Sequence, residues 1–282
     1  RQNEISALIE RGLEDFSVSR SAGRARGWGI PVPGDPGQVI YVWFDALANY
    51  ITALGYGTDE TRLPHYWTHA QAREHVIGKG ITRFHAVYWP AILLSAGLPL
   101  PTRILVHGYL TTEGRKISKS LANAVDPAVY AERYGADALR YFLLRHIRTT
   151  EDGDFSLERF EQAYKSELAG QLGNLVHRTL SLIERSCGGT LSQPSQEFTE
   201  NDTLIHEALS LEEVVTAHLN AYAFDRALDA IWKLVAEANR YVADQQPWAH
   251  AKAVAEAETE TERQDAATRL NGSLYSVAYT LQ

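Results

Sequence analysis

The stretch FHAVYWPAILLSAGLPLPTRILVHGYL, residues 84–110, decides how the first part of this chain folds. Residues 84–98 are apolar at helical spacing and end at Gly97 and the prolines that follow, which is typical of a helix C-terminus. Residues 102–110 are rich in Val, Ile and Tyr, which predicts a strand, and QVIYVWFDAL at 38–47 predicts another strand that leads into a loop. A strand, a helix and a strand joined by short links indicate a βαβ crossover and a parallel sheet.

The second half of the chain has helical periodicity instead. Three stretches show it, at 156–187, 201–222 and 224–248, and the first carries an apolar stripe at three- and four-residue steps, formed by Leu168, Leu172, Leu175, Val176 and Leu180. The connecting segments are the turn-rich residues 188–196 and the acidic run 255–265, which we expect to be a solvated helix end or loop. The sequence therefore predicts an α/β fold followed by an all-α bundle.

Charge changes at the same place as the predicted fold. Residues 1–150 hold 17 Lys and Arg against 13 Asp and Glu, whereas residues 151–282 hold 10 against 22. The acidic second half argues against broad, sequence-blind binding of nucleic acid, which depends on neutralised phosphates. Recognition of a few bases by shape and stacking remains open, because it needs few charges.

Composition limits the class of protein. The chain is 45% hydrophobic and 22% charged, as in soluble globular proteins, and it has no apolar run long enough to span a membrane. Its opening residues, RQNEISALIERG, lack the basic leader and apolar core of a signal peptide. The single cysteine, Cys187, suits a reducing compartment, so we expect a cytoplasmic protein. His65 and His69 lie four residues apart but lack a third ligand nearby, so no metal site is predicted.

The stretch GRKISKSLANAVDP, residues 114–127, places two lysines and two serines in a segment with the character of a loop. An isolated basic pair of this kind is usually a solvated surface turn. The alternative is a flexible clamp for phosphates, since lysine is a compact point charge on a mobile stem.

Several segments in succession resemble the methionyl-tRNA synthetase family, a class I aminoacyl-tRNA synthetase family. They are WGIPVPGDPGQVIYVWFDALANYITALGYG at 28–57, HVIGKGITRFHAVYWPAILLSAGLPLP at 75–101, HGYLTTEGRKISKS at 107–120, YGADALRYFLLR at 134–145 and QPW at 246–248. This order covers nearly the whole chain, and it favours the phosphate clamp over the surface turn.

The resemblance implies a fold, a reaction and partners. Residues 1–150 would form the second half of a Rossmann-like, parallel-sheet catalytic domain that includes the KxSKS loop, and residues 151–282 an anticodon-binding helix bundle. The implied ligase activates methionine with ATP and transfers it to tRNA(Met). ATP is then a substrate, Mg²⁺ is expected with it, and no metal site is expected in this chain. The implied assembly is a monomer that includes the missing N-terminal half.

The resemblance also assigns residues to the phosphates and to catalysis. The implied catalytic residues are Lys116, Lys119 and Arg20, where Arg20 orients an acidic partner of the substrate amine that this chain does not contain. The implied ATP-binding residues are Gly78, Lys79, Lys116, Ser118 and Lys119.

Methionine offers no charged or hydroxyl group on its side chain, so its pocket has to recognise a thioether by shape and by contact with aromatic rings. By resemblance, the lining residues are Trp43, Ala46, Tyr50, Phe84, His85 and Trp89. Trp43 and the segment after Tyr109 are expected beyond the carboxyl ends of the strands, where ligands bind in such sheets. On composition alone, the same aromatic residues could equally form core.

Three residues match the anticodon readers of the family: Asn174, Arg178 and Trp248. Asn174 and Arg178 are four residues apart, so they share one helix face. Trp248 follows Pro247, so we expect it near a helix terminus with one ring face free for a base to stack on. Without the family context, a packed tryptophan and a solvated arginine would explain them.

The chain departs from the family pattern in several places. The His-Ile-Gly-His element of the first half and the zinc-bearing insertion are absent, as is the C-terminal dimerisation appendage of some members. Ile117 stands for the signature methionine, Ala122 for a glycine, and Gly80 for an aspartate that faces the nucleotide. We expect the isolated chain to be inactive, because one wall of the ATP site is absent.

Two other functions stay open at this point. One is a degenerate synthetase paralogue that binds tRNA or another RNA without aminoacylation, which Gly80 and Ala122 would suit. The other is a generic nucleotide-binding protein with a structural bundle, which would not bind tRNA.

Overall fold

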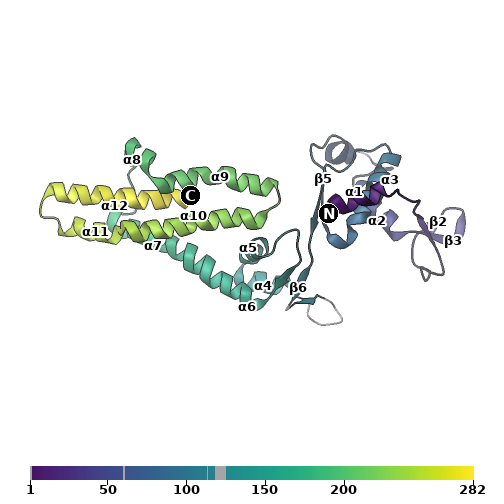
Figure 1. Ribbon diagram of the computed structural model, residues 1–282, viewed down its shortest axis with the longest axis horizontal. Helices are drawn as coiled ribbons and strands as arrows, with labels where there is room; N and C mark the ends of the chain where they lie inside the picture. The colour runs from purple at the N-terminus through teal and green to yellow at the C-terminus, as the bar shows by residue number, and fades with distance from the viewer. Residues whose placement is uncertain (1, 60, 113, 118–124) are drawn as a thin grey trace. The chain divides into compact units, whose positions relative to one another are not determined.

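The chain divides between Tyr109 and Leu110 into unit 1, residues 1–109, and unit 2, residues 110–282 (Figure 1). The computed structural model describes residues 2–59, 61–112, 114–117 and 125–282. This division precedes the domain change predicted near residue 150, and the assignment of residues 110–150 to the catalytic domain stays a prediction. The fold class is confirmed, with strands in parallel pairs and a long helical second half.

A parallel pair of strands organises unit 1. β4 (Glu74–Gly78) pairs with β5 (Arg103–His107), so that Gly78 lies opposite His107 at the carboxyl end of both strands. The crossover between them contains η2 (Lys79–Ile81), η3 (Phe84–Tyr88) and α3 (Trp89–Ser95). The apolar helix and the strand at 102–110 are therefore confirmed, but the first strand of the crossover is β4 and not the predicted strand at 38–47.

The strand predicted at 38–47 is wrong beyond its first residues. β3 (Asp35–Ile40) ends at Ile40, and α2 (Val42–Thr52) begins two residues later. β3 also pairs antiparallel with β1 (Ser19–Ser21) and β2 (Pro31–Val32), so it is no part of the parallel pair. The side chains explain the helix, since Leu47 and Ile51 lie one turn apart and both are buried. Trp43 therefore lies in the first turn of a helix rather than beyond a parallel strand.

The core of unit 1 forms where α2 and α3 meet. Leu47 and Ile51 of α2 pack there with four further buried residues, Leu63, Trp67, Trp89 and Leu93. Trp67 comes from η1 (Pro64–Thr68), and α1 (Gln2–Glu10) begins the chain. This core, together with the contact of Tyr50 with His75, holds α2 beside β4.

Unit 2 begins with a small sheet and two helices. β6 (Leu110–Thr112) lies between β7 (Arg115–Lys116), which is antiparallel to it, and β8 (Gly153–Phe155), which is parallel. α4 (Pro127–Tyr134) and α5 (Ala136–His146) connect these strands. A core of Ala138, Leu139, Phe142, Ile147, Phe155, Phe160 and Ala163 packs this sheet and its helices against the helix that follows.

The predicted helix over 156–187 is continuous but not uniform. It runs through α6 (Leu157–Ala163), η5 (Tyr164–Gly173) and α7 (Asn174–Cys187), and η5 has the wider turns of a π-helix. Within α7 the buried face is formed by Leu175, Thr179 and Ile183, which follow at steps of four residues, and Leu180 lies off that face. Leu175 is buried as predicted, but Leu180 is 58% exposed, and its membership of the buried stripe is wrong.

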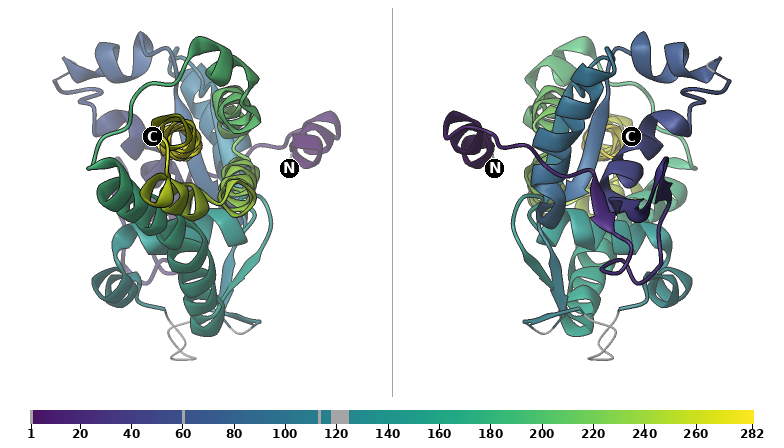
Figure 2. Two further views of the ribbon diagram at one scale, coloured as in Figure 1. Left: turned by 90° about the vertical axis from the view of Figure 1, so that its left-hand side faces the viewer. Right: turned by 90° about the vertical axis from the view of Figure 1, so that its right-hand side faces the viewer.

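Helices α9 (Thr203–Asn220), α10 (Phe224–Gln245), α11 (Pro247–Glu256) and α12 (Glu260–Thr280) complete the bundle, with the short α8 (Gln196–Asn201) before them. α12 contacts α7, α9, α10 and α11, and Figure 2 (left) shows it end-on, in yellow, within the bundle. The predicted helix 224–248 divides at Gln246, whose left-handed φ of 46° ends α10 before Pro247 begins α11.

The acidic run at 255–265 spans the junction between α11 and α12. Thr259 accepts a hydrogen bond from the Glu262 amide, and the Glu262 carboxylate accepts one from the Thr259 amide, which forms a capping box. The run is therefore a solvated helix end, as predicted. Across the described residues, no helix is both long and apolar enough to cross a membrane.

A charged network joins the start of unit 2 to its bundle. The Glu167 carboxylate in η5 accepts hydrogen bonds from the Tyr141 hydroxyl, from Arg145 Nε at 3.2 Å and from His146 Nε2 at 3.1 Å, all on α5. Arg145 also pairs with Asp229 of α10 at 2.5 Å. α5 is thus held to η5 by groups that are mostly buried and to α10 through Asp229, whose side chain is exposed.

Candidate functional site

An aromatic cluster lies where α2 meets η3. Trp43 in the first turn of α2 stacks on Phe84 in η3, with ring centroids 4.1 Å apart and planes 14° apart. Ala46 and Tyr50 follow on α2 at steps of three and four residues, so they lie on the same helix face as Trp43. The structure therefore brings together the predicted residues of α2 and η3.

The hydrogen bonds of His85 fix its tautomer. His85 Nδ1 lies 3.0 Å from the carbonyl oxygen of Ile81, which can only accept, so Nδ1 carries the proton. In the neutral ring Nε2 is then the acceptor, and it receives the Tyr50 hydroxyl at 2.9 Å. Burial raises the pKa of Tyr50, which keeps that hydroxyl protonated as a donor. The pair presents a hydrogen-bonded polar edge to the cluster.

His75, on β4, lies at the centre of this cluster and was not predicted. Its ring is buried, with centroids 4.4 Å from Tyr50 and 5.7 Å from His85, and its Nε2 accepts a hydrogen bond from Trp89 Nε1 at 3.1 Å. Burial, followed by repulsion from His85, lowers the pKa of His75 to about 4. Its alternation with exposed Glu74 and Val76 was the available signal, since His75 and Ile77 then share the buried face.

Trp89 is placed differently from the other predicted pocket residues. It is 0% exposed, and its ring lies against Tyr50 and Trp67 at centroid distances of 5.7 and 5.9 Å. Trp89 therefore supports Tyr50 and His75 from within the core, whereas Ala46 and Tyr50 reach the surface.

The predicted ATP-binding residues of unit 1 lie at the carboxyl end of the parallel pair. Gly78 ends β4, and Lys79 begins η2, with its Nζ 4.8 Å from the centroid of the Tyr109 ring. Gly80 lies against the same ring, because a Cβ there would meet the Tyr109 hydroxyl at 2.1 Å. A side chain at position 80 therefore requires Tyr109 to move.

The loop predicted to clamp phosphates is described only at its base. Lys116 belongs to β7, where its backbone pairs with Thr111 of β6, while Ser118, Lys119 and Ala122 lie outside the described residues. Asp154 anchors this base by accepting hydrogen bonds from the Gly114 amide and the Thr111 hydroxyl, each at 2.7 Å. The Gly114 hydrogen bond and then that of Thr111 lower the pKa of Asp154. Local sequence patterns could not predict this anchor, because Asp154 is 40 residues away from Gly114.

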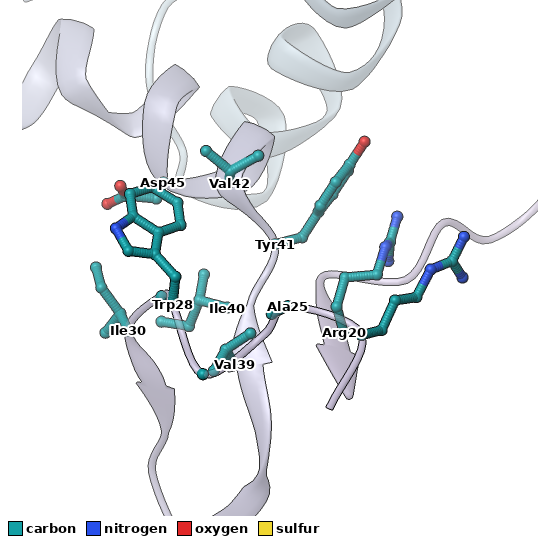
Figure 3. Close-up of a pocket in the computed structure, with 12 residues that line it drawn as sticks. Arg20, Ala25, Trp28, Ile30, Val39, Ile40, Tyr41, Val42 and Asp45 are labelled. Atoms are coloured by element: carbon teal, nitrogen blue, oxygen red, sulfur yellow. The ribbon is translucent and has the colours of Figure 1, made fainter. Parts of the chain in front are cut away.

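Arg20 lies apart from the aromatic cluster, on β1. Its guanidinium lies 3.7 Å from the centroid of the Tyr41 ring, and its Nη1 donates to the carbonyls of Ser17 and Ser19 at 2.9 and 2.7 Å. Arg20 also lines a groove of about 860 Å³ between the β1–β3 segment and the start of α2 (Figure 3). Its predicted acidic partner has no counterpart among these contacts.

The predicted anticodon readers lie on two helices that contact each other. Asn174 and Arg178 are on α7, and Trp248 is in the first turn of α11, 45% exposed, as predicted. Arg178 Nη2 donates to Asn239 Oδ1 at 3.1 Å, and its buried Nε has no hydrogen-bond partner among the described residues. Asn239 in turn donates to the carbonyls of Gln171 and Val235, so α10 orients Arg178. Sequence spacing did not predict this role, because Asn239 is 61 residues from Arg178.

Metal ligands do not gather in the part of the chain that the structure describes. No group of three or more His, Cys, Asp or Glu side chains there is placed to hold a metal ion.

The family model described as "tRNA synthetases class I (M)" matches residues 1–180. Among curated proteins, a methionine–tRNA ligase of Brucella suis is 47% identical over 251 residues, which cover 88% of this chain and 47% of that protein. A methionine–tRNA ligase of Caldanaerobacter subterraneus is 45% identical over 283 residues, which cover 100% of this chain and 42% of that protein. The chain thus spans about half the length of the curated relatives it matches.

The solved structures that match this chain are methionyl-tRNA synthetases as well. The methionyl-tRNA synthetase of Mycobacterium tuberculosis in complex with methionyl-adenylate matches 99% of this chain with a TM-score of 0.84 and 40% identity, over 52% of that protein. The ligand-free form of the M. tuberculosis protein matches with a TM-score of 0.80 and 38% identity.

Proposed function

The chain belongs to the class I tRNA synthetase (M) family, and from that premise we propose that it is the C-terminal part of a methionine–tRNA ligase. The proposed reaction has two steps. The methionine carboxylate attacks the α-phosphorus of ATP and expels pyrophosphate, and the acyl group of the resulting adenylate then passes to a ribose hydroxyl of tRNA(Met).

The observation that carries this proposal is the aromatic cluster formed by α2, η3 and His75 of β4. Stacked Trp43 and Phe84 offer the flat, polarisable surface that suits a thioether, and the neutral Tyr50–His85 pair adds a polar edge without a charge. A pocket lined by rings favours methionine over amino acids with charged side chains, because the charge on such a side chain would be buried there without an opposite charge. We assign Trp43, Ala46, Tyr50, Phe84 and His85 to the pocket, with Trp89 and His75 behind it.

The phosphates of ATP would lie at the carboxyl end of β4. Lys79 follows Gly78 there, where ligands bind in parallel α/β sheets, and its ammonium would face growing negative charge on the departing pyrophosphate. Lys116, Ser118 and Lys119 would bind phosphates of ATP from the loop whose base Asp154 anchors. Mg²⁺ would enter with the phosphates, since it is usually held by them and by few protein ligands.

Arg20 would act at the amino end of the substrate. Its guanidinium is fixed by the Tyr41 ring and two carbonyls, so it can orient a carboxylate without losing further freedom. That carboxylate would come from the half of the active site that precedes this chain. The isolated chain is therefore expected not to aminoacylate tRNA.

The bundle would read the anticodon. Trp248 exposes a ring on α11, and Asn174 and Arg178 share one face of the contacting helix α7. Exposed aromatic rings that stack unpaired bases, together with side-chain donors and acceptors, are how proteins read RNA loops.

Exchange of labelled pyrophosphate into ATP by the full-length protein tests this function. We expect exchange that depends on methionine and falls strongly with leucine or isoleucine in its place. Lys119→Ala should slow this exchange while the affinity for methionine stays the same. Exchange that leucine supports as well as methionine, or no exchange with any amino acid, would refute the proposal.

Gly80 favours one alternative, a paralogue that binds tRNA but no longer activates methionine. The Tyr109 hydroxyl occupies the place of a side chain at this position, so an aspartate there would require rearrangement. A full-length protein that binds tRNA but shows no exchange would support this alternative. Gly80→Asp should be combined with Tyr109→Ala, which makes room for the new side chain. If this double variant recovers exchange, the group that was lost is the carboxylate at position 80.

A further inference from the structure

His75 of β4 is a buried polar residue whose contacts reach the pocket residues from behind. It is 6% exposed, and its ring centroid lies 4.4 Å from that of Tyr50, which is 36% exposed. Its polar contact is the hydrogen bond that His75 Nε2 accepts from Trp89 Nε1 at 3.1 Å. His75 thus touches a residue of the pocket wall through its ring and a fully buried residue through its ring nitrogen.

The hydrogen bond between His75 and Trp89 requires a neutral imidazole. An indole N–H can only donate, so Nε2 of His75 has to be unprotonated to receive it, and Nδ1 then carries the single ring proton. Burial, followed by repulsion from His85, lowers the pKa of His75 to about 4, which keeps the ring neutral at pH 7. The acceptor is therefore present under the conditions in which the protein works.

The nitrogen atoms of the neighbouring rings cannot replace His75 as the acceptor. Trp67 Nε1 is a donor and bonds to the carbonyl oxygen of Pro99 at 3.1 Å. His85 uses Nδ1 for a carbonyl and Nε2 for a hydroxyl. Trp89 is 0% exposed, so water does not reach its indole in this arrangement. Without His75, the indole N–H would be buried unpaired, which is costly enough to turn the ring towards another partner.

We infer that His75 is a positioning residue for methionine, because its Nε2 fixes the orientation of the Trp89 ring and both rings together fix Tyr50. The Trp89 ring lies 5.7 Å from that of Tyr50, so this hydrogen bond joins the two rings that support Tyr50. Tyr50 in turn donates to His85 at 2.9 Å, and the orientation therefore reaches two residues of the pocket wall. The inference rests on the proposed function, which gives these residues their ligand.

Binding of methionine to the full-length protein, measured as a dissociation constant by calorimetry, tests this role. His75→Leu fills the site without an acceptor, whereas His75→Gln returns an acceptor without a ring. Trp89→Phe removes the donor, and it is made alone and together with His75→Leu. Ile77→Val is the matched control, since Ile77 is 4% exposed and shares the buried face of β4 with His75.

His75→Leu should raise the dissociation constant for methionine by roughly ten-fold, because the pocket would hold its binding form in only a fraction of the molecules. His75→Gln should restore most of the affinity. In the Trp89→Phe background, His75→Leu should add little, because the donor that it leaves unpaired is already gone. Ile77→Val should leave methionine affinity unchanged.

The dissociation constant for ATP shows whether a substitution distorts the strand instead. β4 continues from His75 into Gly78, and Lys79 follows directly, so a distorted strand would weaken ATP binding as well. We expect the affinity for ATP to be the same in every variant at His75. If His75→Leu does not fold, His75→Asn makes the same comparison with His75→Gln, because its amide is one bond shorter and falls short of Trp89 Nε1.

The inference is overturned if His75→Leu binds methionine as tightly as the unaltered protein, or if His75→Gln binds it as weakly as His75→Leu. An equal effect of His75→Leu in the presence and absence of Trp89 Nε1 would overturn it too. The same holds for a loss of ATP affinity as large as the loss of methionine affinity, and for a control variant that binds methionine as weakly as His75→Leu. Absence of methionine binding by the unaltered protein refutes the proposed function itself.

Discussion

In unit 1, the side chains around His75 are neutral rings joined by hydrogen bonds, whereas in unit 2 the side chains around Glu167 are charged. In the first group, the rings of Tyr50, His85 and Trp89 lie at centroid distances of 4.4 to 5.9 Å from their aromatic neighbours, and each ring also forms a hydrogen bond. The second holds Arg145 and His146 against one carboxylate, with Asp229 as a further partner of Arg145.

The difference reflects what each region has to do. A pocket for an uncharged side chain gains from rings without charge, because dispersion and shape carry the recognition. At a junction between α5, η5 and α10, charged pairs favour one arrangement of the helices, because any other arrangement would leave a charge unpaired. The two regions should therefore respond differently to mutation and to pH.

The largest expected effect is the loss of the Glu167 charge. Glu167→Gln keeps the size of the side chain but leaves Arg145 and His146 without their shared carboxylate, so unit 2 should lose about 3 kcal/mol of unfolding free energy. Chemical denaturation of the chain, followed by the fluorescence of Trp232 beside Tyr141, measures it. Glu184→Gln, on the exposed face of α7, is the control and should change the free energy by less than about 0.5 kcal/mol. A loss in Glu167→Gln no larger than in this control would show that the network contributes nothing.

The two units should lose unfolding free energy over different ranges of pH. His75 has a folded pKa of about 4 against an ordinary value of 6.5, so the unfolded chain takes up the proton first as pH falls. Unit 1 should therefore be fully stable above pH 6.5 and lose up to about 3 kcal/mol as pH falls towards 4. Burial alone would raise the pKa of Glu167, but hydrogen bonds from Tyr141 and His146 outweigh it and lower that pKa below 4.5. Unit 2 should lose the contribution of Glu167 only as pH falls below about 4.5.

Denaturation at pH 7, 5.5 and 4.5 separates these windows. His75→Gln keeps an acceptor for Trp89 Nε1 but cannot titrate, so it should abolish the loss in unit 1 between pH 6.5 and 4.5 and leave unit 2 unchanged. Persistence of the whole loss in His75→Gln would assign it to another group and remove the contrast between the units.

The two units should also differ in the substrate whose binding a mutation weakens. Trp248→Ala in the full-length protein should weaken tRNA binding by about 2 kcal/mol, roughly thirty-fold, through the lost stacking surface. Pyrophosphate exchange should not change, because Trp248 lies in the bundle. Trp248→Phe is the control, since it keeps a ring. Early melting of Trp248→Ala together with loss of exchange would show that Trp248 is a core residue and that its assignment to the anticodon is wrong.

Most of the helices and strands could be predicted from the sequence where the signal was local. The periodicity of residues 84–98 and the strand at 102–110 placed the crossover, and Pro247 placed Trp248 at a helix terminus. The strand predicted at 38–47 failed because its β-rich start continues into residues whose apolar spacing is helical, and core packing decided between the two. Leu180 was misplaced because the buried face of α7 continues from Leu175 to Thr179 and Ile183, and a residue five positions after Leu175 lies off that face.

Long-range partners had no local signal. The alternation along β4 could place His75 on a buried face, but its partners come from α2, η1 and α3, and Asn239 meets Arg178 across 61 residues, so the partners do not follow from spacing. The resemblance supplied the pocket residues, but only the structure distinguishes Trp89, which is fully buried, from Ala46 and Tyr50 at the surface.

The central claim is that the neutral cluster on α2 and η3 binds the methionine side chain, and Trp43→Ala in the full-length protein tests it most directly. Removing one aromatic contact should raise the KM for methionine in pyrophosphate exchange by roughly five- to ten-fold and leave the KM for ATP unchanged. Trp43→Phe should restore most of the affinity, because it can still stack on Phe84. A KM for ATP that rises as much as the KM for methionine, with Trp43→Phe no better than Trp43→Ala, would contradict the account.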